Sequence, residues 1–146
     1  MHAIRQAEIG DAEAVARLFR TVRRACLPYL PELHTADEDL GFFRDHVFAD
    51  CEVWVPQADA IDGFVAFRTG WVEHLYVHPA RQHRGLGKAL LARAMKTHAP
   101  LRLWVFQRNI AAIRFYRAHG FREIEHTDGS RNEEREPDLL MEWRRA

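Results

Sequence analysis

The chain has only two cysteines, Cys26 and Cys51, among its 146 residues. Two cysteines do not build a disulfide framework or a zinc site. Cys26 falls within a helical pattern and Cys51 opens a strand-like run, so we expect both to be buried free thiols. The chain also lacks any apolar run that approaches the ~20 residues of a membrane span. These absences argue against a disulfide-stabilised secreted protein and against an integral membrane protein.

An excess of either charge is missing as well. Lysine and arginine together number 21, and aspartate and glutamate also number 21, so the formal net charge is zero. This balance gives no support for nucleic acid or a membrane surface as a partner. The N-terminus lacks the charged and then apolar pattern of a signal peptide, and no repeat or low-complexity linker divides the chain. We therefore expect a single domain over residues 1–146, located in a reducing cytoplasm.

What the sequence does contain is a glycine-bearing turn, Gln82-His83-Arg84-Gly85-Leu86-Gly87-Lys88. It lies between an apolar run at 72–77 and a helical pattern from 86 to about 98. Glycines let backbone N–H groups approach an anion closely, and the start of a helix adds a partial positive charge. Arg84 and Lys88 add full charges beside it. The turn therefore predicts a site for the diphosphate of a nucleotide-like cofactor.

Two common nucleotide motifs do not fit this turn. A Walker phosphate loop requires a serine or threonine after its lysine, and Ala89 stands there. A dinucleotide fingerprint requires a third glycine, and Leu90 stands at that position. The glycines alone thus leave the cofactor open.

Hydrophobic periodicity and capping residues predict the order of helices and strands. Asp11, Thr35 with Glu38, and Asn109 are expected to cap helices, and Gly120 fits a left-handed position after a helix. Strands are predicted at 3–7, 51–55, 61–67, 71–77, 101–106, 121–126 and 139–143, and helices at 12–24, 36–48, 86–98 and 110–119.

The arrangement of these elements predicts the fold class. The strands within 51–77 form a meander, whereas the strand, helix and strand of 71–106 form a βαβ unit and hence a parallel pair. The near-continuous apolar run at 101–106 is typical of a central strand. We predict an α/β (α+β) fold with a mixed, mostly antiparallel central sheet flanked by helices, rather than a Rossmann domain.

A family resemblance narrows the choice of cofactor. The pattern Gln82-x-x-Gly85-x-Gly87, after a strand that ends Leu75-Tyr76-Val77-His78-Pro79, resembles the acyl-CoA-binding motif of the GCN5-related N-acetyltransferase (GNAT) superfamily. A second block, Asn109 to Phe121, is similar to that family's downstream helix, in the same order and at the same separation. The resemblance implies the acyl-CoA N-acyltransferase (GNAT) fold and direct acetyl transfer from acetyl-CoA to a primary amine in a ternary complex, without a metal.

The resemblance also implies a set of cofactor-binding residues. In the family, the amides of the turn bind the CoA diphosphate, the preceding strand pairs with the pantetheine arm, and one N–H there polarises the thioester carbonyl. The implied cofactor-binding residues are Leu75, Tyr76, Val77, Gln82, His83, Arg84, Gly85, Leu86, Gly87, Lys88, Asn109 and Tyr116.

Acyl transfer to an amine needs an acid and a base. An alkyl amine with a pKa near ~10 is mostly protonated at neutral pH, so a group must accept its proton, and the leaving thiolate must be protonated or stabilised. Tyr116 matches the family tyrosine proposed as the acid. Glu73 is our candidate for the base, directly or through water. Alternation along the strand places Glu73 on the face of Trp71 and Leu75, and His74 on the opposite face.

Each of these residues also has a purely structural interpretation. The glycines can close a tight turn, Asn109 can cap a helix, Tyr116 can be a core residue, and Glu73 can be an exposed ion-pair partner. His74 and two nearby histidines do not predict a metal site, because no carboxylate-rich or cysteine pattern accompanies them. His74 or His78 as a proton relay stays open.

The acceptor site is expected to come from two other segments, 27–40 and 128–138. Four carboxylates make the second segment acidic, which suits a cationic amine as well as a solvated loop: Glu133, Glu134, Glu136 and Asp138. Tyr29 and His34 are further candidates without an assigned role. The motifs leave open whether the amine belongs to a small molecule or to a protein.

The sequence also leaves open two functions other than acetyl transfer and one protein partner. The chain can be a non-catalytic acyl-CoA-binding sensor or interaction module on the same fold, or a nucleotide-binding regulator. A homodimer is also open, because the apolar strand at 139–143 can pair across two copies.

Overall fold

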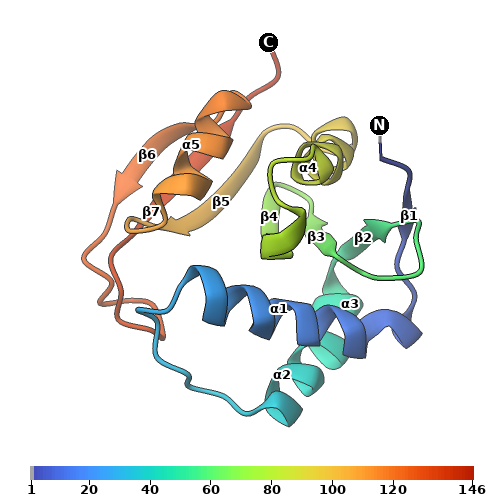
Figure 1. Cartoon of the computed structure of the whole chain (residues 1–146). Coiled ribbons are helices and arrows are strands. Elements are labelled where there is room, and N and C mark those ends of the chain that lie inside the picture. Colours follow the sequence, from blue (N-terminus) through green and yellow to red (C-terminus); the bar gives the residue numbers. More distant parts are fainter. Residues whose placement is uncertain (1) are drawn as a thin grey trace.

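The computed structural model describes residues 2–146. Seven strands form one sheet in the order β1-β2-β3-β4-β5-β7-β6 (Figure 1). The strands are β1 (Ile4–Gln6), β2 (Glu52–Pro56), β3 (Gly63–Arg68), β4 (Trp71–Val77), β5 (Leu101–Phe106), β6 (Arg122–His126) and β7 (Asp138–Trp143). The α-helices are α1 (Ala12–Cys26), α2 (Ala36–Phe42), α3 (Phe48–Asp50), α4 (Leu86–Thr97) and α5 (Ile110–Ala118), and a π-helical segment, Phe43–Val47, joins α2 to α3.

The sheet is mixed and mostly antiparallel, which confirms the predicted fold class. Strands β2, β3 and β4 form an antiparallel meander. Strands β5, β7 and β6 form a second antiparallel group. Only β4 and β5 run parallel, because α4 carries the chain from the end of one to the start of the other.

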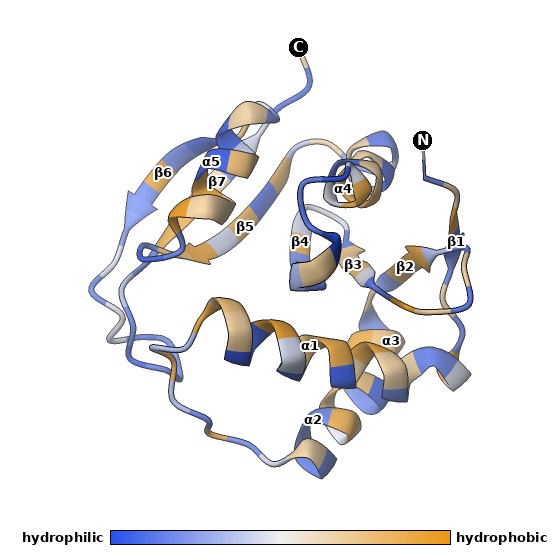
Figure 2. Cartoon of the chain, viewed as in Figure 1, coloured by the Kyte–Doolittle hydropathy of each residue, from blue (hydrophilic) through white to orange (hydrophobic). Residues whose placement is uncertain are grey.

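The helices cover the two faces of the sheet. Figure 1 shows α1 and α2 on one face and α4 and α5 on the other. Two buried apolar clusters match this division: Val15, Phe43 and Phe64 belong to one, and Leu90 and Met141 to the other. In Figure 2 the apolar side of α1 is turned toward the sheet. Along residues 2–146, no helix combines the length and apolarity needed to cross a membrane.

The two strands of the parallel pair diverge. Within residues 2–146, their register contains one pair, Trp71 opposite Arg102, at the start of both strands. Beyond it, an edge of β4 and an edge of β5 face a gap. Within β5, Trp104 is 47% exposed, whereas its neighbours Leu103 and Val105 are buried.

Most predicted caps are present. Thr35 and Glu38 form the capping box, with the Thr35 Oγ1 accepting from the Glu38 N–H at 3.1 Å. Asn109 accepts from the Ala112 N–H at 3.3 Å, and Gly120 has φ +92°. The side chain of Asp11 does not cap α1, however. It pairs with Arg5 at 2.8 Å and accepts from the Glu8 N–H at 2.8 Å, so it caps the preceding 3-10 turn instead.

Two further expectations are wrong. Cys26 is a free thiol, as is Cys51, but Cys26 is exposed because it lies in the last turn of α1 away from the core. The strand at 139–143 is β7, and it lies between β5 and β6. Both of its edges are therefore paired within the chain, and it has no free edge for a second copy.

Candidate active site

The glycine-bearing turn presents free backbone N–H groups at the start of α4. Gly85 adopts φ +89° at the N-cap position, a left-handed conformation that favours glycine. The first helical bond runs from the Ala89 N–H to the Gly85 carbonyl at 3.1 Å, and no side chain caps the helix. The N–H groups of the first turn, residues 86–88, are thus available to an anion together with the helix dipole.

The side chains of the turn have different roles. Arg84 and Lys88 are exposed beside these N–H groups, whereas Leu86 is only 4% exposed and packs in the core. Leu86 can therefore offer only its backbone. The Gln82 side chain donates to the Val77 carbonyl at 3.0 Å and so ties the turn to the end of β4. His2 donates from Nε2 to the Arg84 carbonyl at 2.7 Å on the outer side of the turn.

The last residues of β4 present an unpaired backbone edge to the gap. The His78 N–H donates to Asp62 on the β3 side at 2.7 Å. Successive N–H groups of a strand point to opposite edges, so those of Leu75 and Val77 point toward the diverging β5. An extended amide-containing chain can pair with this edge as an added strand.

The strand β4 contains a bulge at Glu73, which corrects the predicted alternation. Val72 lies opposite Phe67 and His74 opposite Ala66, so Glu73 is the additional residue. Glu73 and His74 consequently line the same cavity rather than lying on opposite faces. Arg68 holds the Glu73 carboxylate through Oε1 at 2.8 Å, which leaves Oε2 directed away from this ion pair.

Tyr116 lies on α5, on the other face of the sheet. Its side chain is 8% exposed and packs against Phe115 and Phe121, with ring centroids 5.4 and 5.5 Å away. Burial raises the pKa of the Tyr116 phenol well above its ordinary value, and the nearby Tyr76 adds to this effect. The phenol thus keeps its proton at neutral pH and can donate it.

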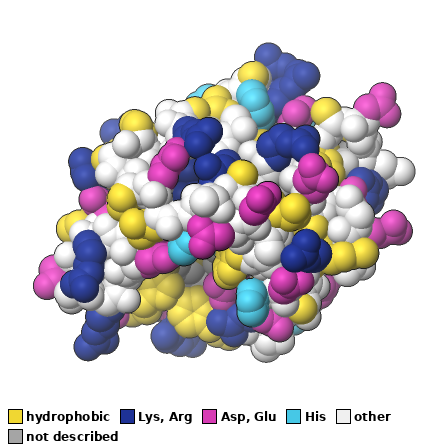
Figure 3. All heavy atoms as spheres, turned by 90° about the horizontal axis from the view of Figure 1, so that it is seen from below, with side chains coloured by type: hydrophobic (Ala, Val, Ile, Leu, Met, Phe, Trp, Pro, Cys, Tyr) yellow, Lys and Arg dark blue, Asp and Glu magenta, His cyan; other side chains and the backbone are white. Residues whose placement is uncertain are grey.

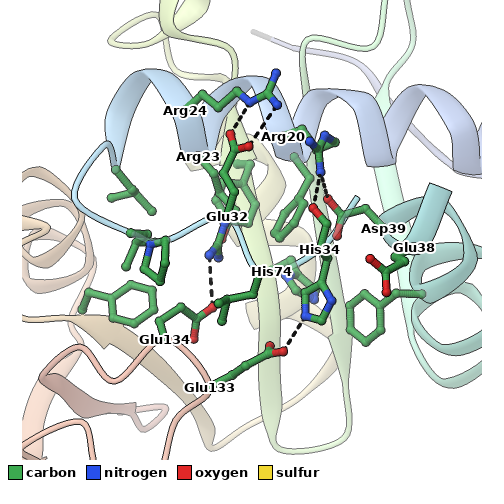
Figure 4. A pocket seen from close by; sticks show the side chains of 18 of the residues that line it. Arg20, Arg23, Arg24, Glu32, His34, Glu38, Asp39, His74, Glu133 and Glu134 are labelled. Carbon is green, nitrogen blue, oxygen red and sulfur yellow. Dashed lines mark hydrogen bonds and ion pairs between the residues drawn. The ribbon is translucent and has the colours of Figure 1, made fainter. Parts of the chain in front are cut away.

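A cavity of about 830 Å³ lies on the α1 and α2 face. Helices α1 and α2 line it together with Glu73, His74 and Tyr76 of β4 and Trp104 and Phe106 of β5, so it reaches the β4–β5 gap. The two segments expected to shape an acceptor site, 27–40 and 128–138, both contribute to its wall. Figure 4 shows His34 from the first and Glu133 from the second pointing toward each other, 2.5 Å apart.

Acidic side chains outnumber basic ones around this cavity. Three arginines line it, and each is paired: Arg20 with Asp39 at 2.7 Å, Arg23 with Glu134 at 3.1 Å, and Arg24 with Glu32 at 2.5 Å (Figure 4). Four further carboxylates line the cavity: Glu38, Asp45, Glu73 and Glu133. Arg44 and Arg68, which lie outside the lining, pair with Asp45 and Glu73, and His34 pairs with Glu133. The seven carboxylates of the lining thus still exceed the five arginines that pair with them. The Thr35 backbone N–H and hydroxyl hold the pKa of Glu38 below its usual range, so it is ionised at neutral pH. The cavity therefore favours cations.

The acidic wall is held by an ordered loop. Asn132 donates to the Glu136 carbonyl at 2.7 Å and accepts from the Glu136 N–H at 3.2 Å. Gln107 donates to the Thr127 and Asp138 carbonyls at 3.0 and 2.9 Å, which closes the base of the loop. The carboxylates of this loop are therefore positioned before any ligand arrives.

His74 lies deep in the cavity among aromatic rings. Phe43 and Phe19 approach it with ring centroids at 5.4 and 5.7 Å. Burial lowers the pKa of His74 to about 4, and the positive charge of Arg23 acts in the same direction. The imidazole is therefore neutral at physiological pH. Within residues 2–146, no three histidine, cysteine or acidic side chains are grouped so that they could hold a metal ion.

Sequence analysis did not predict Phe42 and Trp104 as cavity residues, whereas Leu33 lies within the segment 27–40 that it expected there. The sequence did contain a signal for Phe42. It is a large apolar residue outside the helix face formed by Leu40, Phe43 and Val47, so helical spacing does not predict that it is buried. Trp104 carried none, since an apolar residue in an apolar strand predicts burial. Its exposure arises because α1 packs on β3 and β4 and leaves this part of β5 uncovered, which local sequence does not encode.

Comparison with known proteins places these features in a family. Residues 35–123 match the model of the acetyltransferase (GNAT) domain. The peptidyl-lysine N-acetyltransferase YiaC of Escherichia coli (strain K12) is 30% identical over 142 residues, which cover 96% of this chain and 95% of that protein. The solution structure of apo-form YjaB from Escherichia coli superposes with a TM-score of 0.78 at 20% identity, covering 98% of this chain and 97% of the other. The structure of yncA from Salmonella typhimurium with acetyl-CoA superposes with a TM-score of 0.74 at 20% identity, covering 99% and 94%.

Proposed function

The chain belongs to the acetyltransferase (GNAT) domain family, and from this premise we propose that it transfers the acetyl group of acetyl-CoA to a primary amine held in the acidic cavity. Because it belongs to this family, the protein is an acetyltransferase that uses acetyl-CoA as co-substrate. The proposal concerns the acceptor and the residues that act on it, with residues 1–146 working as one domain.

One observation carries the proposal. The gap between β4 and β5 has a backbone anion site and a free strand edge on one side, and a cation-favouring cavity on the other. Acyl transfer in a ternary complex needs a thioester and an amine to be bound at the same time with their reacting atoms adjacent. The gap provides this arrangement, because each reactant reaches it from its own face of the sheet.

On the cofactor side, the chain is proposed to act mainly through its backbone. The N–H groups of 86–88 and the charges of Arg84 and Lys88 would hold the diphosphate. The Leu75 and Val77 edge would pair with the pantetheine amides, and one of these N–H groups would donate to the thioester carbonyl oxygen. Asn109 lies at the start of α5, where its carboxamide caps the helix.

On the acceptor side, the proposed chemistry is one substitution accompanied by proton transfers. Glu73 accepts a proton from the ammonium group through an oxygen of its carboxylate, directly or through water, and so frees the nitrogen lone pair. The amine nitrogen forms a bond to the acetyl carbon of acetyl-CoA, the carbon–sulfur bond breaks, and the nitrogen releases its second proton to solvent. Tyr116 donates its phenolic proton to the leaving sulfur and regains one from solvent. The products are the N-acetyl amine and free CoA.

Thiol release tests the proposal directly. Purified protein is mixed with acetyl-CoA and a panel of amines, and free CoA is followed with a thiol reagent. Isothermal titration with acetyl-CoA, ATP and NAD is run in parallel, because a glycine-bearing turn at the start of a helix can also hold a nucleotide. Binding of acetyl-CoA alone and amine-dependent thiol release are expected. Failure to bind acetyl-CoA at millimolar concentration would overturn the proposal.

Glu73→Gln tests the proposed base. Removing the proton acceptor is expected to lower kcat by about 10²-fold and to change the shape of the pH–rate profile, while the affinity for acetyl-CoA stays the same. Glu123→Gln is the matched control, because Glu123 is another partly exposed carboxylate paired with an arginine, at 2.6 Å, outside the cavity. An unaltered rate and profile in Glu73→Gln would remove Glu73 from the mechanism.

A further inference from the structure

The mouth of the acidic cavity carries an unusual concentration of exposed apolar surface. Six large apolar side chains of residues 2–146 are strongly exposed, and Leu33, Phe42 and Trp104 are three of them, at 46%, 44% and 47%. All three line this one cavity. We call them the apolar rim. Exposed apolar groups that gather at one cavity mark a binding surface more reliably than scattered ones do.

The apolar rim is assembled by the fold from three distant segments. Leu33 lies in the connection after α1, Phe42 ends α2, and Trp104 lies midway along β5. His74 and Tyr76 lie deeper in the same cavity and are less exposed. A ligand that fills this cavity is therefore in contact with these side chains.

Charge and apolar surface together define the occupant. The excess of carboxylates over arginines in the lining favours a cation, and the rim favours an apolar group attached to it. Figure 3 shows acidic and apolar side chains side by side around a hollow on this face of the molecule. A polyamine would satisfy the carboxylates, but its short methylene segments between charges offer less apolar surface to these side chains than a leucine does. A lysine in a flexible polypeptide satisfies both when an apolar side chain lies near it in sequence.

We propose that the acceptor is a protein lysine flanked by a large apolar residue, which packs on Leu33, Phe42 and Trp104 while the lysine ammonium enters the acidic cavity. This specificity rests on the proposed acetyl transfer and adds the neighbour of the lysine as a determinant. Partial burial of a leucine side chain at the rim corresponds to about a tenfold preference.

End-blocked peptides of equal length test the specificity. Each contains one lysine, flanked on both sides by leucine, by glycine or by aspartate, and spermidine serves as the small-molecule amine. The readout is kcat/KM from thiol release with saturating acetyl-CoA, confirmed by mass spectrometry of the acetylated lysine. The leucine-flanked peptide is expected to exceed the glycine-flanked one about tenfold, with the aspartate-flanked peptide the poorest.

Variants then assign the preference to the rim. Trp104→Ala and Phe42→Ala are expected to reduce the leucine-to-glycine ratio, measured within each variant, toward one. Ile124→Ala is the matched control, because Ile124 is 45% exposed on β6 and lies outside the cavity, so its ratio is expected to equal that of the parent. Because the leucine-to-glycine ratio is taken within each variant, a general loss of activity or of folded protein does not change it.

The outcomes separate this inference from the function on which it rests. Equal rates on the three peptides, or a preference for spermidine, would overturn the apolar-flank specificity while leaving acetyl transfer intact. A preference that survives in both rim variants would overturn the role of the rim. Absence of thiol release with every amine, despite acetyl-CoA binding, would overturn the proposed function and this inference together.

Discussion

The two sides of the β4–β5 gap are built in different ways. The cofactor side consists of one continuous stretch, from the end of β4 through the turn to the first turn of α4, and its polar groups are mainly backbone N–H groups. The acceptor side consists of side chains from α1, α2, β4, β5 and two connecting segments. One side is local in sequence, and the other exists only in the folded chain.

This difference indicates which kinds of substitution should impair each side. A backbone site depends on conformation, so a change of φ at one glycine should damage it more than a change of side chain nearby. A side-chain site depends on charge and shape, so single substitutions should alter selectivity without abolishing the reaction. Four predictions test this contrast, from the largest expected effect to the smallest.

Tyr116→Phe should produce the largest effect, because Tyr116 is the proposed proton donor where the two sides meet. Removing its hydroxyl should lower kcat by about 10²-fold or more, with little change in acetyl-CoA affinity. Steady-state kinetics and isothermal titration measure the two quantities separately. A non-catalytic sensor would show no turnover in the parent protein and unchanged binding in the variant, which would contradict the enzymatic role.

The buried His74 should make stability depend on pH, and this dependence belongs to the acceptor side. The pKa of His74 is about 4 in the folded protein, below its ordinary value of 6.5. The unfolded chain therefore binds more protons between these values, so stability is complete above pH 6.5 and falls as pH decreases toward 4, by up to about 3 kcal/mol. Urea unfolding at several pH values measures the loss. His74→Leu should flatten this part of the curve, and an unchanged slope would show that other groups cause it.

Gly85→Ala should weaken the cofactor side through its backbone. A left-handed conformation costs a non-glycine residue about 1–2 kcal/mol, so the turn should relax and the acetyl-CoA Kd should rise about tenfold. Gly70→Ala is the control, because Gly70 also has a positive φ, +83°, and an added Cβ would meet nothing within 4 Å. Both variants should lose similar stability, but only Gly85→Ala should lose affinity. An acetyl-CoA Kd in Gly85→Ala equal to that of the parent would mean that the conformation of the turn is not needed for binding.

Glu133→Gln should produce the smallest effect and should act only on the amine. Removing one carboxylate from the half-exposed wall should reduce kcat/KM for a cationic acceptor about threefold, because solvent screens the charge. The acetyl-CoA Kd should not change. Glu125→Gln removes an exposed charge on β6, outside the cavity, and should alter neither value. A change in acetyl-CoA affinity in Glu133→Gln would mean that the two sides are not separate.

Much of the fold followed from local patterns. The bounds of β4 and β5, the capping box at Thr35 and the cap at Asn109 agree with sequence because each depends on neighbouring residues. The predictions that are wrong concern residues whose conformation depends on contacts outside their own helix or strand. Asp11 caps a different turn because Arg5 attracts its carboxylate, and the alternation along β4 fails at Glu73 because pairing with β3 inserts a bulge.

The sequence by itself determined the conformation of the proposed cofactor side, since Gln82 to Lys88 and Asn109 to Phe121 carry it in continuous blocks. Only the tertiary structure decided the proposed acceptor side. The packing of α1 and α2 on the sheet leaves Trp104 exposed and places Leu33, Phe42 and the acidic loop around one cavity. The physical reason is that backbone conformation is set by near neighbours, whereas a cavity is the space that distant side chains leave between them.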